Sequence, residues 1–223
     1  MINLIIFDCD GVLVDSEIIA NRIDAETFKQ FGYLISVEEC IKRFSGVDVK
    51  NTRRILREES AVDIPCEIFE DIQKNILSAF SHELLPLMTD VLKEVTRQNT
   101  PRCIASSSQK ERVIYSLELT EQLQFFEQNH IFTSQQVTHG KPASDLFLFA
   151  PRQMNCSPEN CLVIEDSPPG IEAAKAAGMQ VIGFTGGSHA QFSWYQDRLR
   201  KYNTPLAKNS AEVLSLIKTL SLQ

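Results

Sequence analysis

The chain has 223 residues, of which 43% are hydrophobic and 23% charged, and it carries a formal net charge of -7. This length and composition suit one large globular domain, or a core with an insertion, and exclude a long disordered chain. The negative charge argues against a nucleic acid or an anionic membrane as a partner, because both require a basic surface.

The six cysteines and the N-terminus indicate the cellular setting. The cysteines are scattered and form no C-x-x-C pair, which argues against a zinc site. The N-terminus lacks a basic region and a cleavage signal, and no stretch approaches the ~18 consecutive apolar residues of a membrane span. We therefore expect a cytoplasmic protein with reduced cysteines. We also expect a monomer, with a weak dimer as the alternative.

The first predicted element is a buried strand that ends in two acids. Residues 4–7 are continuously apolar, as in a parallel strand that is covered on both faces. Asp8 and Asp10 follow two residues apart, so the alternation of a strand points both carboxylates roughly the same way. A divalent cation would relieve their repulsion and leave one acid to attack and the other to transfer a proton. The alternative is an acidic turn after a buried strand.

Residues 16–82 contain helical patterns and no convincing strand. The predicted helices cover residues 19–31, 37–44 and 49–59 and a fourth stretch after Pro65. Ser36 and Glu39 form a capping box at the start of the second helix. We expect this segment to fold as a separate all-helical unit, inserted into a core that is formed by residues 1–15 and 83–223.

From Leu84 onward, predicted helices and strands alternate. Strands are expected at residues 102–105, 131–133, 161–164 and 181–184. Helices are expected at residues 89–98, around 113–117 and 146–150, at 171–177 and after an N-cap at Ser210. This alternation is typical of a doubly wound, Rossmann-like parallel sheet, so the predicted fold class is α/β with an all-helical insertion.

Three predicted strands end in residues that carry chemistry. These residues are Asp8 and Asp10, then Ser106 and Ser107, then Glu165 and Asp166. In an open α/β sheet the carboxyl ends of the strands line one crevice, where ligands bind. We therefore expect these side chains to converge.

The converging groups suit phosphoryl transfer. Asp8 is placed to attack phosphorus and form an aspartyl-phosphate, while Asp10 can protonate the leaving oxygen and then deprotonate water. Ser106 and Lys141 can donate hydrogen bonds and positive charge to the phosphoryl oxygens. Because the nearby ligands are all oxygens, the expected cation is Mg²⁺. Its ligands would be Asp8, Asp166, Glu165 and the backbone carbonyl of Asp10.

Each of these features also has an ordinary structural interpretation. The serines are compatible with a loop or N-cap, and Lys141, which precedes a proline, with a solvated turn. Glu165 and Asp166 are compatible with acids that favour a helix N-terminus. The ordered set of features is much harder to explain by coincidence than any single one.

Four segments resemble the motifs of the haloacid dehalogenase superfamily. They are DCDGVLVDSE at 8–17, IASSS at 104–108, GKPASDLF at 140–147 and VIEDSPPGIEAAKAAGM at 163–179. The chain is most similar to the β-phosphoglucomutase-like phosphatases, which carry a helical cap between the first two motifs. The resemblance implies that Asp8 is the nucleophile and Asp10 the acid/base. It further implies phosphate binding by Ser106, Ser107 and Lys141, and Mg²⁺ binding by Asp8, Asp10, Glu165 and Asp166.

The same resemblance narrows the reaction. Dehalogenases and phosphonatases lack an acid at the position of Asp10, and transporting ATPases need membrane spans. The mutase branch typically has a His in the first cap helix and an Arg after the cap's Gly-Val turn, where this chain has Ala20, and Asp48 and Val49. We therefore expect an Mg²⁺-dependent phosphatase that hydrolyses a small phosphorylated metabolite, either a sugar phosphate or a phosphogluconate-like ester. The alternatives are a phosphomutase and a catalytically silent phosphometabolite-binding protein.

Substrate choice is expected to lie on the helical insert. The candidate residues lie at the hinge or near the turn at Gly46, and they are Ser16, Asn21, Lys42, Arg43 and Lys50. For each of them, the alternative is an ordinary solvated surface residue.

Overall fold

The computed structural model describes residues 2–222. Its chain divides into two compact units. The sheet unit combines the residues up to Asp15 with those from Leu85 onward, and the helical unit comprises Ser16–Leu84. The division falls two residues after the boundary expected from the sequence, because the last helix of the insertion continues to Glu83.

The sheet unit is built on six parallel strands in the order β3-β2-β1-β4-β5-β6. The strands are β1 (Leu4–Phe7), β2 (Arg102–Ser106), β3 (Ile131–Thr133), β4 (Cys161–Glu165), β5 (Gln180–Phe184) and β6 (Leu206–Ala207). Every residue of the neighbouring strands β1 and β4 is buried. Their continuous apolar runs therefore have the environment that a parallel strand covered on both faces requires.

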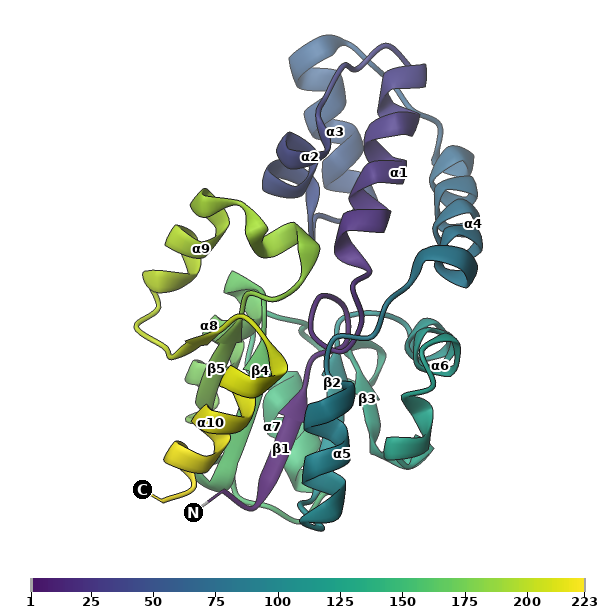
Figure 1. Ribbon diagram of the computed structural model, residues 1–223. Helices are drawn as coiled ribbons and strands as arrows, with labels where there is room; N and C mark the ends of the chain where they lie inside the picture. Colours follow the sequence, from purple (N-terminus) through teal and green to yellow (C-terminus); the bar gives the residue numbers. More distant parts are fainter. Residues whose placement is uncertain (1, 223) are drawn as a thin grey trace. The chain divides into compact units, whose positions relative to one another are not determined.

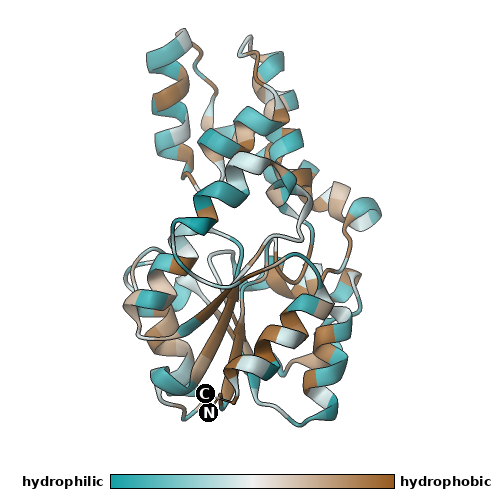
Figure 2. Ribbon diagram, turned by 60° about the vertical axis from the view of Figure 1, so that its left-hand side comes forward, coloured by the Kyte–Doolittle hydropathy of each residue, from teal (hydrophilic) through white to brown (hydrophobic). Residues whose placement is uncertain are grey.

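Helices cover both faces of this sheet (Figure 1). They are α5 (Thr89–Arg97), α6 (Lys110–Leu119), α7 (Asp145–Gln153), α8 (Pro168–Ala176), α9 (Ser193–Arg200) and α10 (Ser210–Leu220). Helix α5 packs against α10, and α7 packs against α8. Figure 2 shows apolar strands between helices that are polar on their outer sides. The predicted doubly wound α/β class is confirmed.

Two elements and one helix cap differ from the sequence-based expectation. Strand β6 has two residues, and α9 has only Tyr195 and Leu199 buried, so neither produces a clear apolar period. The predicted N-cap at Ser210 is wrong. Asn209 caps α10 instead, and its Oδ1 accepts a hydrogen bond from the backbone N–H of Glu212 at 3.0 Å. Both residue types cap well, and here the earlier one has the extended backbone of a cap.

The helical unit contains α1 (Glu17–Gln30), α2 (Val37–Phe44), α3 (Val49–Ser60) and α4 (Cys66–Glu83). Ser36 caps α2, because its Oγ accepts from the backbone N–H of Glu39 at 3.1 Å. Helix α1 packs against α2 and α4. The buried ring of Phe28, near the end of α1, contacts three other aromatic rings, those of Tyr33, Phe44 and Phe69. This aromatic cluster is part of the core of the helical unit, together with buried aliphatic residues such as Leu56 and Ile72.

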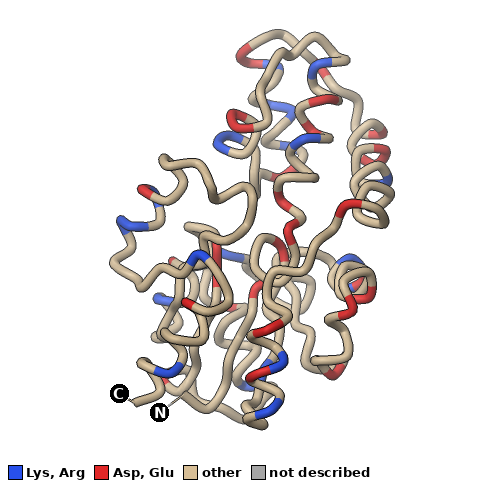
Figure 3. Tube along the Cα trace, in the orientation of Figure 1, with Lys and Arg blue, Asp and Glu red and all other residues tan. Residues whose placement is uncertain are grey.

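Charged residues of both signs are interspersed along the helices of each unit (Figure 3). Many of those in the helical unit pair with each other, for example Arg57 with Asp63 at 2.7 Å and Arg54 with Glu58 at 2.7 Å. Across residues 2–222, none of the helices has the length and apolarity that a bilayer crossing demands. The mixture of positive and negative residues (Figure 3) and the ion pairs between them are typical of solvated helix faces.

Phe28→Ala tests the importance of the aromatic cluster. Removing a fully buried aromatic side chain from a core typically costs about 3–5 kcal/mol, so the helical unit should unfold at lower denaturant concentration and be cleaved faster by protease. The matched control is Leu34→Ala, since Leu34 is 79% exposed. If the two variants were equally stable, the cluster would not be part of the core of this unit.

Candidate active site

Asp8 lies directly after β1, near the middle of the sheet. The strand register places Phe7 opposite Ile164 of β4, and the backbone N–H of Asp8 donates to the Ile164 carbonyl at 3.0 Å. The next residue of β4 is Glu165, so Asp8 and Glu165 leave adjacent strands at the same level. Parallel pairing thus brings these two acids to one edge of the sheet.

Asp8, Glu165 and Asp166 form a buried carboxylate cluster. One oxygen from each can lie within 4.8 Å of the other two. Lys141 joins the cluster, with its Nζ 2.5 Å from Asp8 Oδ1 and 2.7 Å from Glu165 Oε1, and it also donates to the Ala105 carbonyl at 3.0 Å. When all four groups are ionised, three carboxylates and one ammonium leave two negative charges. A cation can compensate buried charge of this size, and an all-oxygen donor set fits a hard divalent cation such as Mg²⁺.

The pKa shifts in this cluster reflect the same imbalance. Burial raises the pKa of Asp8 well above its usual value, and the carboxylates of Glu165 and Asp166 add to the increase, although Lys141 opposes it. Burial acts to lower the pKa of Lys141, but the charges of Asp8 and Glu165 outweigh it and raise that pKa. Lys141 is therefore a permanent cation at neutral pH. Asp8 is a carboxylate whose charged form needs further compensation.

Two glycines allow the acids to approach the backbone. A Cβ at Gly170 would lie 1.7 Å from Glu165 Oε1, and a Cβ at Gly11 would lie 2.1 Å from Asp166 Oδ2. Gly11 also has a φ of +79°, in the left-handed region that favours glycine. A side chain at either position would displace a member of the carboxylate cluster.

Asp10 is held separately from the carboxylate cluster. Ser108 Oγ donates to Asp10 Oδ2 at 2.6 Å, and Arg112 Nη2 lies 3.3 Å from Asp10 Oδ1. Ser106 is buried, and its Oγ accepts from the backbone N–H of Ser108 at 3.0 Å, which fixes this turn. Ser107 is exposed, and its carbonyl accepts a hydrogen bond from Ser134 Oγ at 2.8 Å. The structure thus brings Asp10 close to the serine turn that the sequence analysis singled out.

Three residues near these acids had no role predicted from the sequence: Ser108, Arg112 and His189. Ser108 belongs to the quoted IASSS segment but had no role without its contact to Asp10. Arg112 lies in the first turn of α6, four residues beyond Ser108. His189 follows β5, and its Nε2 lies 2.8 Å from Asp166 Oδ2. The rule that strand ends converge, applied to β5 as well, would have drawn attention to the polar segment after this strand.

The candidate residues of the helical unit have contacts within that unit. Asn21 is buried, with its Nδ2 donating to the Glu17 carbonyl at 2.8 Å, and its Oδ1 accepts from Ser45 Oγ at 3.1 Å. Arg43 donates to the Tyr33 hydroxyl at 2.5 Å and pairs with Glu59. The other three candidates differ in exposure: Ser16 is fully buried, while Lys42 and Lys50 are exposed. Asn21 and Arg43 therefore contribute to the structure of the helical unit.

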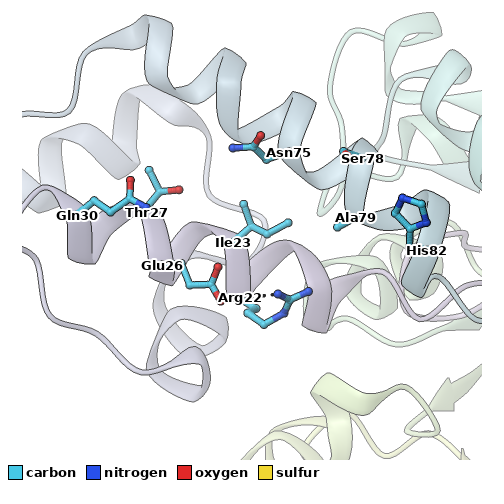
Figure 4. Close-up of a pocket in the computed structure, with 9 residues that line it drawn as sticks. All are labelled: Arg22, Ile23, Glu26, Thr27, Gln30, Asn75, Ser78, Ala79 and His82. Atoms are coloured by element: carbon cyan, nitrogen blue, oxygen red, sulfur yellow. Dashed lines mark ion pairs between the residues drawn. The ribbon is translucent and has the colours of Figure 1, made fainter.

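A groove lies between α1 and α4 of the helical unit (Figure 4). Its polar lining comes mainly from Arg22, Glu26 and Gln30 on α1 and from Asn75, Ser78 and His82 on α4. The one guanidinium among these, that of Arg22, lies 3.7 Å from Glu26 and 2.6 Å from Glu83. Its charge is thus already balanced by acids of the same unit, and none of these six residues belongs to the predicted site.

Comparison with known proteins identifies the family. A family model described as haloacid dehalogenase-like hydrolase matches residues 5–184. The chain belongs to the haloacid dehalogenase-like hydrolases. This confirms the resemblance that was inferred from the four sequence motifs.

Two curated relatives of this hydrolase are phosphatases. It is 28% identical to the 6-phosphogluconate phosphatase of Escherichia coli (strain K12), over 84% of this chain and 85% of that protein. It is also 28% identical to a phosphorylated carbohydrates phosphatase of Thermotoga maritima, over 80% and 82% of the two chains. A haloacid dehalogenase-like protein of unknown function from Agrobacterium tumefaciens has the same fold, with a TM-score of 0.88, 34% identity, and 99% and 100% of the two chains covered.

Asp8→Asn tests the charge imbalance at the site. We expect this change to raise the Tm of the hydrolase in chelator by about 2–4 °C, the shift expected for ~1 kcal/mol in a protein of this size, because it removes a buried charge that faces two other acids. The pKa of Asp8 is higher in the folded state than in the unfolded chain. Ionisation of Asp8 therefore costs stability once the pH rises above the pKa of this residue in the unfolded chain. The gain should therefore be present at a pH of about 8 and absent at about 3, where Asp8 is protonated in both states.

The matched control for this prediction is Asp10→Asn. Asp10 has a hydroxyl and a guanidinium as partners, so its replacement should lower the Tm or leave it unchanged. Thermal melts in chelator across this pH range measure both variants. An Asp8→Asn variant that is less stable than wild type at pH 8 would contradict the account.

Proposed function

We propose that this hydrolase is an Mg²⁺-dependent phosphatase that acts on a small phosphorylated metabolite, either a sugar phosphate or a phosphogluconate-like ester. The observation that carries the proposal is the carboxylate cluster of Asp8, Glu165 and Asp166 around Lys141. It combines a nucleophile, an oxygen-only cation site and a fixed positive charge within a few ångströms. Phosphoryl transfer requires these three components.

In this proposal, Asp8 attacks the phosphorus atom and forms an aspartyl-phosphate. Lys141 holds Asp8 Oδ1 at 2.5 Å, which leaves the second oxygen of this carboxylate for the attack. The Lys141 ammonium also offsets the negative charge that the phosphate group brings. Asp8, Glu165, Asp166 and the carbonyl of Asp10 would hold Mg²⁺, and this ion would neutralise charge on the phosphoryl oxygens.

Asp10 acts as the acid/base of the proposed reaction. It protonates the leaving oxygen in the first step and deprotonates the attacking water in the second. The hydroxyl of Ser108 and the guanidinium of Arg112 hold its carboxylate. We propose that Ser106 and Ser107 contribute phosphate contacts, through a hydroxyl group and through backbone N–H groups of this turn.

The proposed substrate class rests on the relatives and on the helical unit. Both curated relatives described above act, by name, on phosphorylated carbohydrates or their acids. The exposed residues Lys42 and Lys50 remain our candidates for substrate selection. Burial of Ser16 and Asn21 and the pairing of Arg43 with Glu59 favour structural roles for these three residues. Ala20 stands where the mutase branch typically has a His, and Asp48 and Val49 stand where it typically has an Arg. This favours hydrolysis over mutase chemistry.

Phosphate release tests the proposal. The panel comprises 6-phosphogluconate, hexose phosphates and glycerol phosphate, each with Mg²⁺ and with chelator. We expect release from at least one ester with Mg²⁺ only, and a loss of at least ~10³-fold in Asp8→Asn and in Asp10→Asn, since each variant lacks a group that reacts. Asp90→Asn, an exposed acid on α5, is the matched control and should retain wild-type rates.

The alternatives predict different results in the same assay. Conversion of one sugar phosphate into its isomer without net phosphate release would show a mutase. Binding of esters without any turnover would show a phosphometabolite-binding protein. Release that continues at the wild-type rate in Asp8→Asn would contradict the proposed nucleophile.

A further inference from the structure

His189 lies beside the carboxylate cluster on a turn that the catalytic proposal leaves without a role. It belongs to the 3-10 helix η5 (Ser188–Gln191), which follows β5. Its side chain is 1% exposed, and its Nε2 lies 2.8 Å from Asp166 Oδ2. The ring packs edge-on against Tyr195, with 5.1 Å between the centroids. A buried imidazole at this distance from a buried carboxylate is a specific arrangement and needs an explanation.

Two glycines shape the space that His189 occupies. A Cβ at Gly187 would lie 2.7 Å from His189 Cε1, and a Cβ at Gly11 would lie 2.8 Å from the same atom. Gly11 is also the residue that lies against Asp166 Oδ2. The imidazole and the carboxylate therefore occupy space that a side chain at either glycine would take, so both glycines are needed for the two groups to meet.

The turn that carries His189 is itself fastened to the loop after β1. The backbone N–H of Ser188 donates to Asp15 Oδ1 at 2.9 Å, and Ser188 Oγ donates to Asp15 Oδ2 at 2.5 Å. Asp15 is 8% exposed and is the last residue of the sheet unit before the insertion. The two oxygens of one buried carboxylate thus hold the backbone N–H and the side-chain hydroxyl of Ser188, the residue immediately before His189.

The arrangement assigns His189 a positioning role and not a ligand role. Among residues 2–222, the side chains that lie close enough together to hold a metal ion are the three carboxylates of the cluster. His189 is not one of them, although histidine is a common metal ligand. His189 Nε2 lies beside one oxygen of Asp166, Oδ2, so the other oxygen of this carboxylate can still be offered to a cation.

We propose that His189 is a positioning residue for the metal site, which orients the Asp166 carboxylate through its Nε2 and so increases the affinity of the carboxylate cluster for a divalent cation. The inference rests on the proposed function, because it assumes that the cluster binds such a cation. Partners of this kind around a metal ligand typically change metal affinity by about 10–100-fold when they are removed.

Direct binding of Mn²⁺ to the whole chain, followed by electron paramagnetic resonance without substrate, tests the inference. His189→Leu keeps much of the side-chain volume and removes the nitrogen, so its Kd for Mn²⁺ should rise about 10–100-fold. His189→Gln places an amide N–H near the position of Nε2 and should stay within about threefold of wild type, by the same reasoning. His130→Ala, a half-buried histidine at a distant turn, is the matched control and should bind like wild type.

A second measurement does not depend on the folding of a variant. In wild-type protein labelled with ¹⁵N at histidine, addition of Mg²⁺ should shift the ring signals of His189 and leave those of His130 in place. A His189→Leu variant that folds and binds Mn²⁺ with the wild-type Kd, or a His189 signal that Mg²⁺ does not shift, would overturn the positioning role alone. A wild-type protein that binds no Mn²⁺ would overturn the metal site of the proposed function and this inference with it.

Discussion

The candidate active site of the sheet unit is governed by one electrostatic constraint. Its three buried carboxylates share a single buried ammonium group. Asp8, Glu165 and Asp166 lie within 4.8 Å of one another, and Lys141 reaches two of them. Burial removes the water that would otherwise stabilise these charges, and this is why the pKa of Asp8 is raised. In the proposed function, a divalent cation and a phosphate ester are the partners of this cluster. The proposed function thus uses a group whose charged form lowers local stability.

The rest of the sheet unit supplies what this arrangement requires. The apolar strands β1 and β4 are fully buried, so their ends are rigid supports for Asp8 and Glu165. Gly11 and Gly170 leave space where a side chain would displace an acid. Asp10 has partners of its own, Ser108 and Arg112, so its carboxylate is kept apart from the repulsion within the cluster. Two carboxylates that are two residues apart thus have different environments, as their proposed roles of nucleophile and acid/base require.

Much of the fold and several residues of the candidate site could be predicted from the sequence, because apolar patterns and helix caps depend on neighbouring residues only. The apolar run of residues 4–7 identifies a buried strand, and acids stand at the carboxyl end of this strand and of β4. The helices of the insertion were predicted to within a few residues, because apolar residues recur at helical spacing and Ser36 marks the start of α2. The family resemblance then gave the order of the motifs a chemical meaning.

What the sequence could not supply depends on contacts between distant residues. Arg112 is one of many arginines in the sequence, and only the fold shows that it lies 3.3 Å from Asp10. His189 is separated from Asp166 by β5 and a turn, and no local pattern connects them. Asn209 and Ser210 are both good caps, and backbone geometry decides between them. The short strand β6 forms because β5 offers it an edge, which no feature of its two residues indicates.

The central claim is that Asp8 becomes covalently phosphorylated, and chemical trapping tests it most directly. The enzyme would be quenched in acid during turnover of an ester that it hydrolyses, and then reduced with borohydride, which converts an acyl-phosphate side chain into homoserine. Peptide mass spectrometry would locate the change. The account predicts homoserine at position 8 in the presence of substrate and an unmodified Asp8 without it. Rapid phosphate release under the same conditions, with Asp8 always unmodified, would contradict the account.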